Sequence, residues 1–340
     1  MTAAVLAVDG GNSKTDVALV AADGGLLAAV RGPTTSHQAV GLEAGMDRLV
    51  GLVERAAVAA GLDPAARPVA PVGVFTVDGA DFPSDVRLLS AALRGRSLAG
   101  EDVIANDCFG ALWAGATAGW GIALICGEGI NGAAISPDGR RASFDGIGAI
   151  SGDWGGGHAV GLAGLGAAVR AVDGRGPRTS LEQAVPAAFG MARPRAVVRA
   201  MYEGRLAERR TSSLSPVVFA AATGGDAVAR SIVDRLADEL ATMAIALARR
   251  TAMLRREVEV VLAGGVFRTT DQEFYARIES RIREHARRAA LVRLDTPPVT
   301  GAALEGLNRA APGRTGIERL AARQRLSAAL RTWDRSITGG

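Results

Sequence analysis

Residues 3–20 read AAVLAVDGGNSKTDVALV, and this stretch decides the fold. Its first apolar run stops at Asp9, and a second apolar run follows Asp16 after a glycine-rich turn. Two β-forming runs joined by such a turn are typical of a β-hairpin. A third run at residues 26–30 comes after an Asp-Gly-Gly turn. We therefore predict an antiparallel meander of three strands at the start of the chain.

Helix and strand patterns alternate after this meander. The spacing of apolar residues distinguishes the two, because helices repeat every 3.6 residues and strands every second residue. The first part of the chain is expected to follow the order βββαβαβα, with strands at 72–77 and 103–105 and helices at 41–60, after Pro83 and at 107–118.

A similar order begins at Gly121. We expect strands at 121–126, 132–136, 141–144, 258–263 and 290–294, several helices between 154 and 250, a helix at 271–288, and helical residues from 299 onward. This structural repeat predicts an α/β protein with two related domains, residues 1–116 and 117–316, and a cleft between them. An arginine-rich helix over about 317–340 is expected to pack back on the first domain.

Composition and charge exclude several classes of protein. The 340 residues carry 39 basic and 35 acidic side chains, and arginines alternate with acids, so we expect no nucleic-acid partner. No apolar run is long enough to span a bilayer, and the N-terminal run is a strand rather than a signal peptide. Cys108 and Cys126 belong to no CxxC pair. These features predict a cytoplasmic protein that does not bind a membrane.

Lys14 is the sole lysine among the 39 basic residues. It lies in the turn Asp9-Gly10-Gly11-Asn12-Ser13-Lys14-Thr15, whose glycines let backbone N–H groups approach an oxyanion closely. A lysine is a compact point charge that suits a tight anion pocket. We predict that this turn binds phosphate and that Asp9 holds Mg²⁺. The alternative is a plain hairpin turn, which needs glycine and asparagine for positive φ but not Asp9 or Lys14.

Two further glycine segments are candidates for nucleotide binding. The repeat places the turn Gly127-Glu128-Gly129 opposite the first turn, where it can help to clamp a polyphosphate. The Glu128 carboxylate repels phosphate unless it points away or binds the metal. Gly264-Gly265 ends a buried strand, where a ring or ribose can lie on the backbone; an ordinary strand-to-helix connection is the alternative.

Two carboxylates near helix starts are candidates for chemistry. Asn106-Asp107 follows a strand and opens a helix, so both residues fit helix caps. Asp107 also fits a base that accepts the proton of an attacking hydroxyl. In Gly152-Asp153, the aspartate fits equally a helix cap and a ligand for the hydroxyls of a polyol.

Six motifs occur in the order seen in a known family: DGGNSKT, NDCFGALWAG, GEGINGAAISPDGR, SGDWGGG, VVLAGGVF and PPVTGAALEGL. Over about residues 3–310 the chain resembles the N-acetylglucosamine kinase and BadF/BadG/BcrA/BcrD-type ATPase family of the actin, sugar kinase and Hsp70 superfamily. The resemblance implies two ribonuclease-H-like, actin-like ATPase domains that close over ATP, Mg²⁺ and a sugar, often in a homodimer.

The resemblance also implies roles for individual residues. Asp107 corresponds to the base for the sugar 6-hydroxyl, and the turns at 9–15 and 127–129 correspond to two phosphate loops. Gly264-Gly265 corresponds to the adenosine site. The positions that correspond to sugar contacts are Ser36, His37, Asn106, Asp107, Asn131, Gly152 and Asp153. Many members have Gly-Thr-Gly-Ser-Asn in place of residues 127–131 and asparagine in place of Ser36.

The expected function is ATP-dependent phosphorylation of an amino sugar, N-acetylglucosamine or glucosamine, at the 6-hydroxyl, with ATP and Mg²⁺ as cofactors. One alternative is an ATPase of the dehydratase-activator type, which needs exposed cysteines for an iron–sulfur cluster. The other is a catalytically weak sugar-binding regulator, which Glu128 favours.

Overall fold

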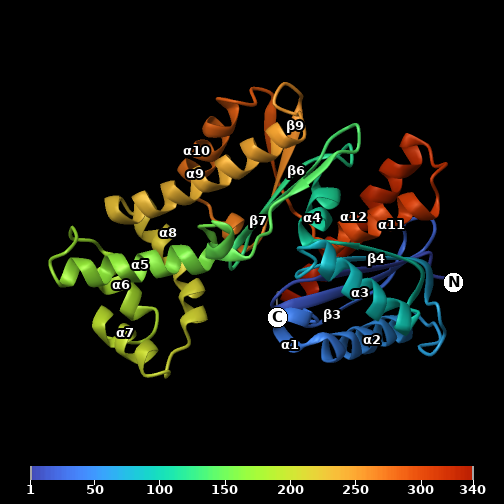
Figure 1. Ribbon diagram of the computed structural model, residues 1–340, viewed down its shortest axis with the longest axis horizontal. Coiled ribbons are helices and arrows are strands. Elements are labelled where there is room, and N and C mark those ends of the chain that lie inside the picture. The colour runs from blue at the N-terminus through green and yellow to red at the C-terminus, as the bar shows by residue number, and fades with distance from the viewer. Residues whose placement is uncertain (1, 339–340) are drawn as a thin grey trace. The chain divides into compact units, whose positions relative to one another are not determined.

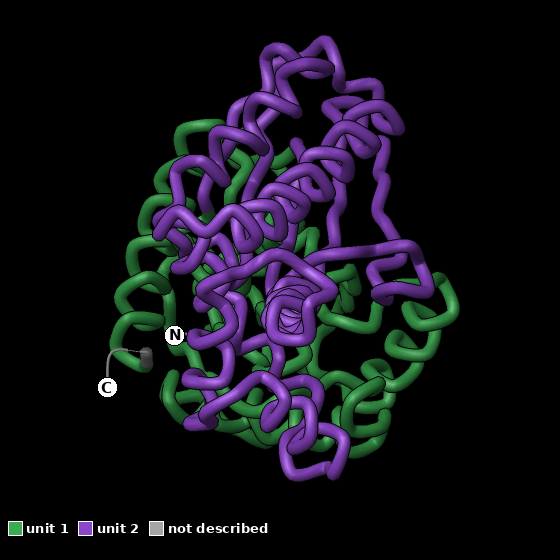
Figure 2. Tube along the Cα trace, turned by 90° about the vertical axis from the view of Figure 1, so that its left-hand side faces the viewer, with its two compact units in different colours: residues 1–120, 294–340 green, residues 121–293 purple. Residues whose placement is uncertain are grey.

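The computed structural model describes residues 2–338 and divides the chain into two compact units. Unit 1 comprises residues 1–120 and 294–340, and unit 2 comprises residues 121–293 (Figure 2). The sequence prediction instead ended the first domain at 116 and assigned residues up to 316 to the second. The difference lies mainly in helix α11 (Val299–Ala310), which packs on strands and a helix of unit 1.

Unit 1 is built on a mixed five-stranded sheet with the order β3-β2-β1-β4-β5 (Figure 1). β1 pairs antiparallel with β2 and parallel with β4, while β3 and β5 form the edges. The predicted meander is therefore confirmed. The strands are β1 (Val5–Gly10), β2 (Lys14–Val20), β3 (Leu26–Pro33), β4 (Ala70–Val77) and β5 (Ala99–Ala105).

Helices cover both faces of this sheet, so β1 is buried on both sides. Leu6 and Val8 pack into the core formed with α2 and α3, whereas Val5 meets Gly306 of α11. A Cβ at Gly306 would lie 2.3 Å from Val5 Cγ1, so only glycine allows this approach. The helices of unit 1 are α1 (His37–Val40), α2 (Leu42–Ala59), α3 (Pro83–Arg96), α4 (Asp107–Gly115), α11 and α12 (Gly316–Thr338).

Unit 2 repeats this topology. Its sheet has the order β10-β9-β6-β7-β8, with β6 antiparallel to β7 and parallel to β9. β6 thus takes the position that β1 has in unit 1, which confirms the structural repeat expected from the sequence. The strands are β6 (Gly121–Cys126), β7 (Ile130–Ile135), β8 (Arg141–Ser143), β9 (Val258–Ala263) and β10 (Ala289–Arg293).

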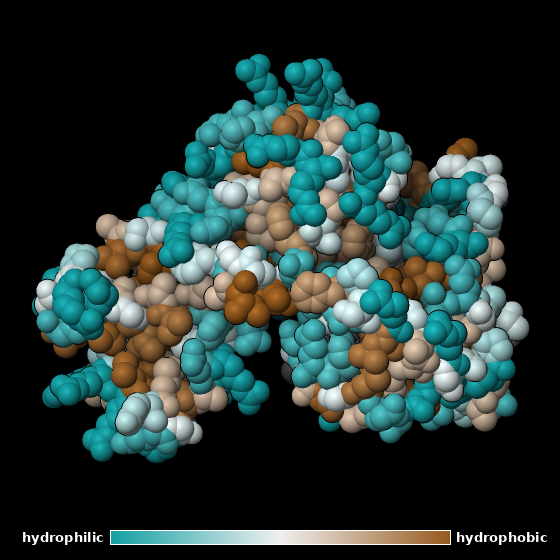
Figure 3. Space-filling view, in the orientation of Figure 1, coloured by the Kyte–Doolittle hydropathy of each residue, from teal (hydrophilic) through white to brown (hydrophobic). Residues whose placement is uncertain are grey.

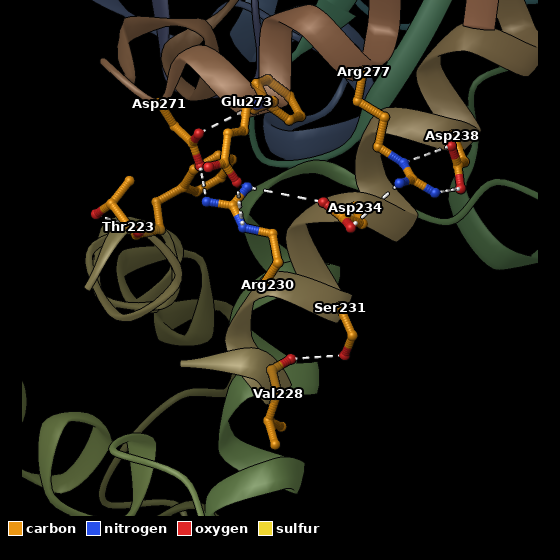
Figure 4. Close-up of polar contacts among 11 residues, drawn as sticks. Thr223, Val228, Arg230, Ser231, Asp234, Asp238, Asp271, Glu273 and Arg277 are labelled. Atoms are coloured by element: carbon orange, nitrogen blue, oxygen red, sulfur yellow. Dashed lines mark hydrogen bonds and ion pairs between the residues drawn. The ribbon is translucent and has the colours of Figure 1, made fainter. Parts of the chain in front are cut away.

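Helix α9 is the longest helix of unit 2. α9 packs on β6 and β7 and against α10, and ion pairs fix the two helices to each other (Figure 4). Arg230 on α9 contacts Asp271 at 2.8 Å, and Arg277 on α10 contacts Asp238 at 2.7 Å. The helical segments are α5 (Gly156–Val172), α6 (Leu181–Ala187), α7 (Pro194–Tyr202), α8 (Ser215–Thr223), α9 (Ala227–Arg250), α10 (Gln272–Arg283) and the 3-10 turns η1 (Gly148–Ser151), η2 (Glu208–Leu214) and η3 (Gly265–Arg268).

On the face shown in Figure 3, apolar side chains gather over α5 to α7 of unit 2 (brown at the left), and smaller apolar areas lie elsewhere on it. Leu162, Val169, Val198 and Met201 line a groove there of about 680 Å³. Within residues 2–338, no helix combines the length and the hydropathy that a membrane crossing requires.

Candidate functional site

The turn between β1 and β2 exposes its backbone. Residues 11–13 link the strands, and the Gly11 N–H donates to the Lys14 carbonyl at 2.9 Å. A plain hairpin turn would explain glycine and asparagine here by their ability to adopt a positive φ. None of Gly10, Gly11 and Asn12 has a positive φ, so that explanation does not apply. The nearest atom to a Cβ at Gly11 would be the Lys14 carbonyl oxygen, at 3.9 Å, which is an ordinary van der Waals contact. Neither conformation nor packing requires Gly11, so its backbone is open to the phosphate contact that the sequence predicts.

Lys14 is oriented by a buried carboxylate. Its Nζ lies 3.3 Å from Asp16 Oδ2, and the Asp16 side chain is fully buried. Arg31 donates to the same carboxylate through Nε at 2.6 Å and Nη2 at 2.7 Å. Asp16 therefore holds one cation on each side, and the half-exposed Lys14 remains at the mouth of the turn.

Asp9, at the end of β1, is buried among other carboxylates. Thr76 Oγ1 lies 3.4 Å from Asp9 Oδ1. Burial raises the pKa of Asp9 well above its usual range, and the charges of Asp16 and Asp107 raise it further, while Lys14 lowers it. A carboxyl in these surroundings ionises readily only when a cation arrives.

Asp107 is the first residue of α4, directly after β5. Asn106 caps the helix, because its Oδ1 accepts the Cys108 N–H at 3.1 Å. Burial raises the pKa of Asp107 to about 7, with smaller contributions from the charges of Asp78 and Asp81. A carboxyl with a pKa near neutrality is suited to accept a proton at physiological pH. Asp107 in turn raises the pKa of Asp9, so both belong to one electrostatic cluster.

Asp78 and Asp81 belong to this cluster, and the sequence analysis missed them. Both follow β4, and Asn106 Nδ2 donates to Asp81 Oδ1 at 2.9 Å. Burial raises the pKa of both carboxyls. The sheet topology could have identified them, because β4 and β5 are parallel neighbours and the carboxyl ends of parallel strands meet at one edge of a sheet.

The loop that carries Ser36 and His37 is tied to the first turn. Thr34 Oγ1 donates to the Gly11 carbonyl at 2.8 Å, and the Ser36 N–H donates to Thr34 Oγ1 at 3.1 Å. The Thr15 hydroxyl faces that of Thr35 at 3.0 Å rather than the turn opening. His37 lowers the pKa of Asp78 and Asp81 by its charge. Ser36 and His37 thus lie beside the carboxylate cluster.

Unit 2 contains a pocket of about 700 Å³. The two glycine segments identified in the sequence line this pocket together with residues of η2 and α8. The residues of η2 and α8 carry no recognisable motif, so they were not predicted. Apolar side chains, hydroxyls and one guanidinium suit a nucleoside. The lining residues are Gly127, Glu128, Gly157, Ser212, Ser215, Pro216, Phe219, Ala220, Thr223, Gly265, Val266, Arg268, Thr269 and Thr270.

The glycines of these segments fall into two kinds. A Cβ at Gly127, Gly129 or Gly265 would meet no atom within 4 Å, and none of the three has a positive φ. Gly264 is required by the fold, because its φ is 109° and a Cβ there would lie 2.4 Å from the Cys126 carbonyl oxygen. The three open glycines leave backbone accessible to a ligand.

The second turn is fixed by the start of α5. The Gly157 N–H donates to the Gly127 carbonyl at 2.8 Å, and the His158 N–H donates to the Glu128 carbonyl at 3.0 Å. These bonds satisfy two of the helix's free amides, which are then not available to phosphate. The Glu128 side chain is exposed and lines the pocket.

Asn131, Gly152 and Asp153 lie near one another in unit 2. The Asn131 side chain packs on the backbone of Gly146, and the Asp153 N–H donates to the Gly148 carbonyl at 3.2 Å. Asp153 does not cap α5, whose N-cap is Gly155 without a side-chain bond. Its carboxylate accepts the Ser151 hydroxyl instead, and its contact with a polyol stays a prediction.

A divalent cation fits Asp9. No group of three or more His, Cys, Asp or Glu that could hold a metal occurs within residues 2–338. Magnesium bound with a nucleotide takes only one or two protein carboxylates, together with phosphate oxygens and water. The raised pKa of Asp9, surrounded by like charges, is what a cation would relieve.

The structure thus brings the predicted residues together in two groups, one in each unit. Unit 1 holds the first turn, Ser36, His37 and Asn106-Asp107, and unit 2 holds the second turn, Gly264-Gly265 and Asn131 with Gly152-Asp153. A cleft shared by both groups stays a prediction.

Comparison with known proteins gives consistent results. A model of the BadF/BadG/BcrA/BcrD ATPase family matches residues 6–306. The N-acetylmuramic acid/N-acetylglucosamine kinase of Clostridium acetobutylicum is 27% identical over 265 residues, which cover 77% of this chain and 85% of the relative. The N-acetyl-D-glucosamine kinase of Dictyostelium discoideum is 25% identical over 314 residues, which cover 89% of this chain and 97% of the relative.

A solved structure shows the same fold. The crystal structure of a protein from Chromobacterium violaceum, proposed to be an N-acetylglucosamine kinase, matches with a TM-score of 0.70 at 24% identity. The match covers 90% of this chain and 99% of that one. It confirms the predicted actin-like ATPase fold. Since the family model spans nearly the whole sequence, the chain belongs to the BadF/BadG/BcrA/BcrD ATPase family.

Proposed function

We propose that this protein is a sugar kinase that transfers the γ-phosphoryl group of ATP to an amino sugar, N-acetylglucosamine or glucosamine, at the 6-hydroxyl. The names of the two matched kinases support the substrate class. The observation that carries the proposal is the buried carboxyl of Asp107, with a pKa of about 7, in one electrostatic cluster with Asp9 at the first turn.

Each group has a distinct role in this proposal. Asp107 accepts the proton of the sugar hydroxyl as the phosphoryl group is transferred. Lys14 and the backbone N–H groups of the first turn bind phosphate oxygens, and the pocket of unit 2 receives the nucleoside. A Mg²⁺ ion held through Asp9 would neutralise phosphate charge. Ser36, His37, Asn131, Gly152 and Asp153 would contact the sugar.

The burial of both thiols speaks against the dehydratase-activator alternative. Burial raises the pKa of Cys126 to about 12 and the pKa of Cys108 well above its usual range. Cluster ligands are thiolates, and a cluster shared between subunits needs them at the surface. These two cysteines are buried and protonated, so they fit small core residues.

A screen of coupled ADP release over amino sugars, hexoses and cyclitols tests the proposal. We expect the fastest ADP release with N-acetylglucosamine or glucosamine, and a ³¹P–¹H correlation of the product to the C6 protons. Calorimetric binding of sugar without ADP release at any sugar would favour the regulator instead. ADP release with hexoses alone would contradict the amino-sugar substrate class but would still support a sugar kinase.

The homodimer that the resemblance implies is part of the proposal. Light scattering during gel filtration is expected to give twice the chain mass of 34.7 kDa. A mass equal to one chain at micromolar concentration would contradict it.

A further inference from the structure

Helix α12 is docked on unit 1 from Ala322 onward. Its apolar side chains Ala322, Leu326 and Leu330 are buried. Near its C-terminus, Asp334 contacts Arg31 at 2.7 Å, and the Arg31 guanidinium lies 5.2 Å from the centre of the Trp333 ring. A helix fixed by apolar burial and by these contacts presents its remaining side chains from a stable position.

One of those side chains, Arg323, binds the C-terminal end of α4. Its Nη2 donates to the carbonyls of Trp113 and Ala116, and its Nη1 donates to the carbonyl of Ala114, each at 2.8 Å. The last carbonyls of a helix have no partner within the helix and carry the negative end of its dipole. The planar guanidinium therefore satisfies three acceptors and places a positive charge where α4 favours it.

The opposite end of the same short helix carries Asp107. α4 has nine residues, so its two ends are about 13 Å apart at 1.5 Å per residue. Its middle is in backbone contact with α11, because a Cβ at Gly301 would lie 1.8 Å from the Gly110 carbonyl oxygen. Because α4 is short and packs closely against α11 at its middle, a displacement of one of its ends is transmitted to the other.

The start of α4 is restrained by side-chain hydrogen bonds, as its end is. Asn106 holds it through one bond to Cys108 and one to Asp81, and Asp81 itself has a carboxyl that resists ionisation. The three bonds from Arg323 are charge-assisted and hence about twice as strong as neutral ones. Together with the burial of residues 108–114 and the contact with α11, Arg323 thus helps to set the position of α4 along its own axis.

We propose that Arg323 is a positioning residue that sets where the Asp107 carboxyl stands relative to the first turn. The inference rests on the proposed function, because it assigns to α12 the alignment of the proton acceptor. The nucleotide contacts of the first turn come from β1 and β2, which Arg323 does not touch. Loss of Arg323 should therefore reduce kcat while leaving the KM for ATP unchanged.

The test compares Arg323→Ala with Arg319→Ala. Arg319 lies one turn earlier on α12, and within residues 2–338 its side chain donates to the carbonyls of Arg314 and Pro312 and not to α4, so it is a matched control. Since a misplacement of about 1 Å can cost about a hundredfold in rate, we expect kcat of Arg323→Ala to fall on the order of tenfold. Its KM for ATP should stay within about twofold, and Arg319→Ala should match the wild type.

Arg323→Lys keeps the charge but loses the planar fork, so an intermediate kcat is expected; this variant also serves if Arg323→Ala does not fold. A purely structural role would lower the melting temperature and leave kcat per folded molecule unchanged, which would overturn the inference. Failure of the proposed function would be distinguishable, because the wild type itself would then release no ADP with any sugar.

Discussion

The carboxyl of Asp107 lies in surroundings that oppose its charge. Burial is the main cause, and the neighbouring Asp78 and Asp81 add to it, so the pKa rises to about 7. A base works only when deprotonated. We therefore expect kcat/KM for the sugar to rise with pH up to about 7 and then to level off.

A variant of Asp81 should move this pH dependence. Asp81→Asn removes a negative charge near Asp107 and keeps an acceptor for Asn106, so the pKa of Asp107 falls and the acid limb shifts to lower pH. Asp102→Asn is the control, because Asp102 does not contribute to the shift at Asp107. pH–rate profiles from 5.5 to 9 would measure both, and an acid limb that stays in place in Asp81→Asn would contradict the assignment.

Glu128 is the second residue whose charge can be tested. Its exposed carboxylate lines the pocket of unit 2, where nucleotide phosphates would be repelled by it. Glu128→Thr should lower the KM for ATP several-fold, and Glu128→Asp, which keeps the charge, should not. Steady-state titration of ATP at saturating sugar measures this. A raised KM in Glu128→Thr would mean that the carboxylate binds the nucleotide, directly or through the metal.

Single residues were predictable from the sequence where composition itself carried the signal. Lys14 stood out as the only lysine, and Asp107 stood out because it opens a helix after a strand. Asp78 and Asp81 were missed because their relevance depends on the pairing of β4 with β5, which local patterns do not give. Arg268 and Phe219 were missed because nothing in the sequence joins α8 to the Gly264-Gly265 segment.

Among the elements, α4 and α11 have the closest backbone contact near the candidate site. Gly301→Ala would place a methyl group 1.8 Å from the Gly110 carbonyl oxygen, and neither helix backbone can move without disturbing β1. We expect this variant to lose about 3 kcal/mol or more of stability, at the upper end of overpacking costs.

The matched substitution is Gly51→Ala in α2 of the same unit. A Cβ at Gly51 meets no atom within 4 Å, so the variant should gain about 0.5–1 kcal/mol from helix propensity. Urea unfolding of both variants measures the difference. Equal stability of the two would show that α4 and α11 are not packed as described.

At the level of elements, the sequence predicted all ten strands of the two sheets. β5 begins four residues before its predicted start at 103, and the first turn is shorter than predicted: β1 continues through Gly10 and β2 begins at Lys14, so three residues connect them. The ladder extends because Asp9 pairs with Asp16 and both are buried, against the expectation that charged residues end a strand. Tertiary burial thus overrode the local pattern.

At the scale of the whole molecule, the pocket that we propose for the nucleoside is lined by residues of unit 2, while the carboxylate cluster lies within unit 1. Hydrogen exchange measured with and without ADP and Mg²⁺ can test ligand binding at the pocket and at the cluster separately. We expect ADP to slow exchange mainly at residues 212–223 and 264–270, and sugar alone to slow it at residues 34–38 and 106–109. Protection by ADP at neither segment of unit 2 would mean that the pocket does not take the nucleoside.

The sequence repeat predicted the architecture of the two units, but it did not predict that the C-terminal part of the chain belongs to unit 1. Both units share one strand order, and the sequence showed it as two similar series of strands and helices. The assignment of α11 to unit 1 depends on Gly301 and Gly306, which permit contact with α4 and β1. Glycines in a helix do not reveal from sequence alone which surface they meet.

The most direct measurement is the steady-state rate of Asp107→Asn with N-acetylglucosamine and ATP. A general base contributes roughly 10²–10⁴-fold, so we predict that kcat falls on the order of a thousandfold while the KM for ATP changes little. The amide is nearly isosteric and keeps the start of α4 intact. A purified, folded Asp107→Asn protein that phosphorylates the sugar as fast as the wild type would contradict the role of this carboxyl.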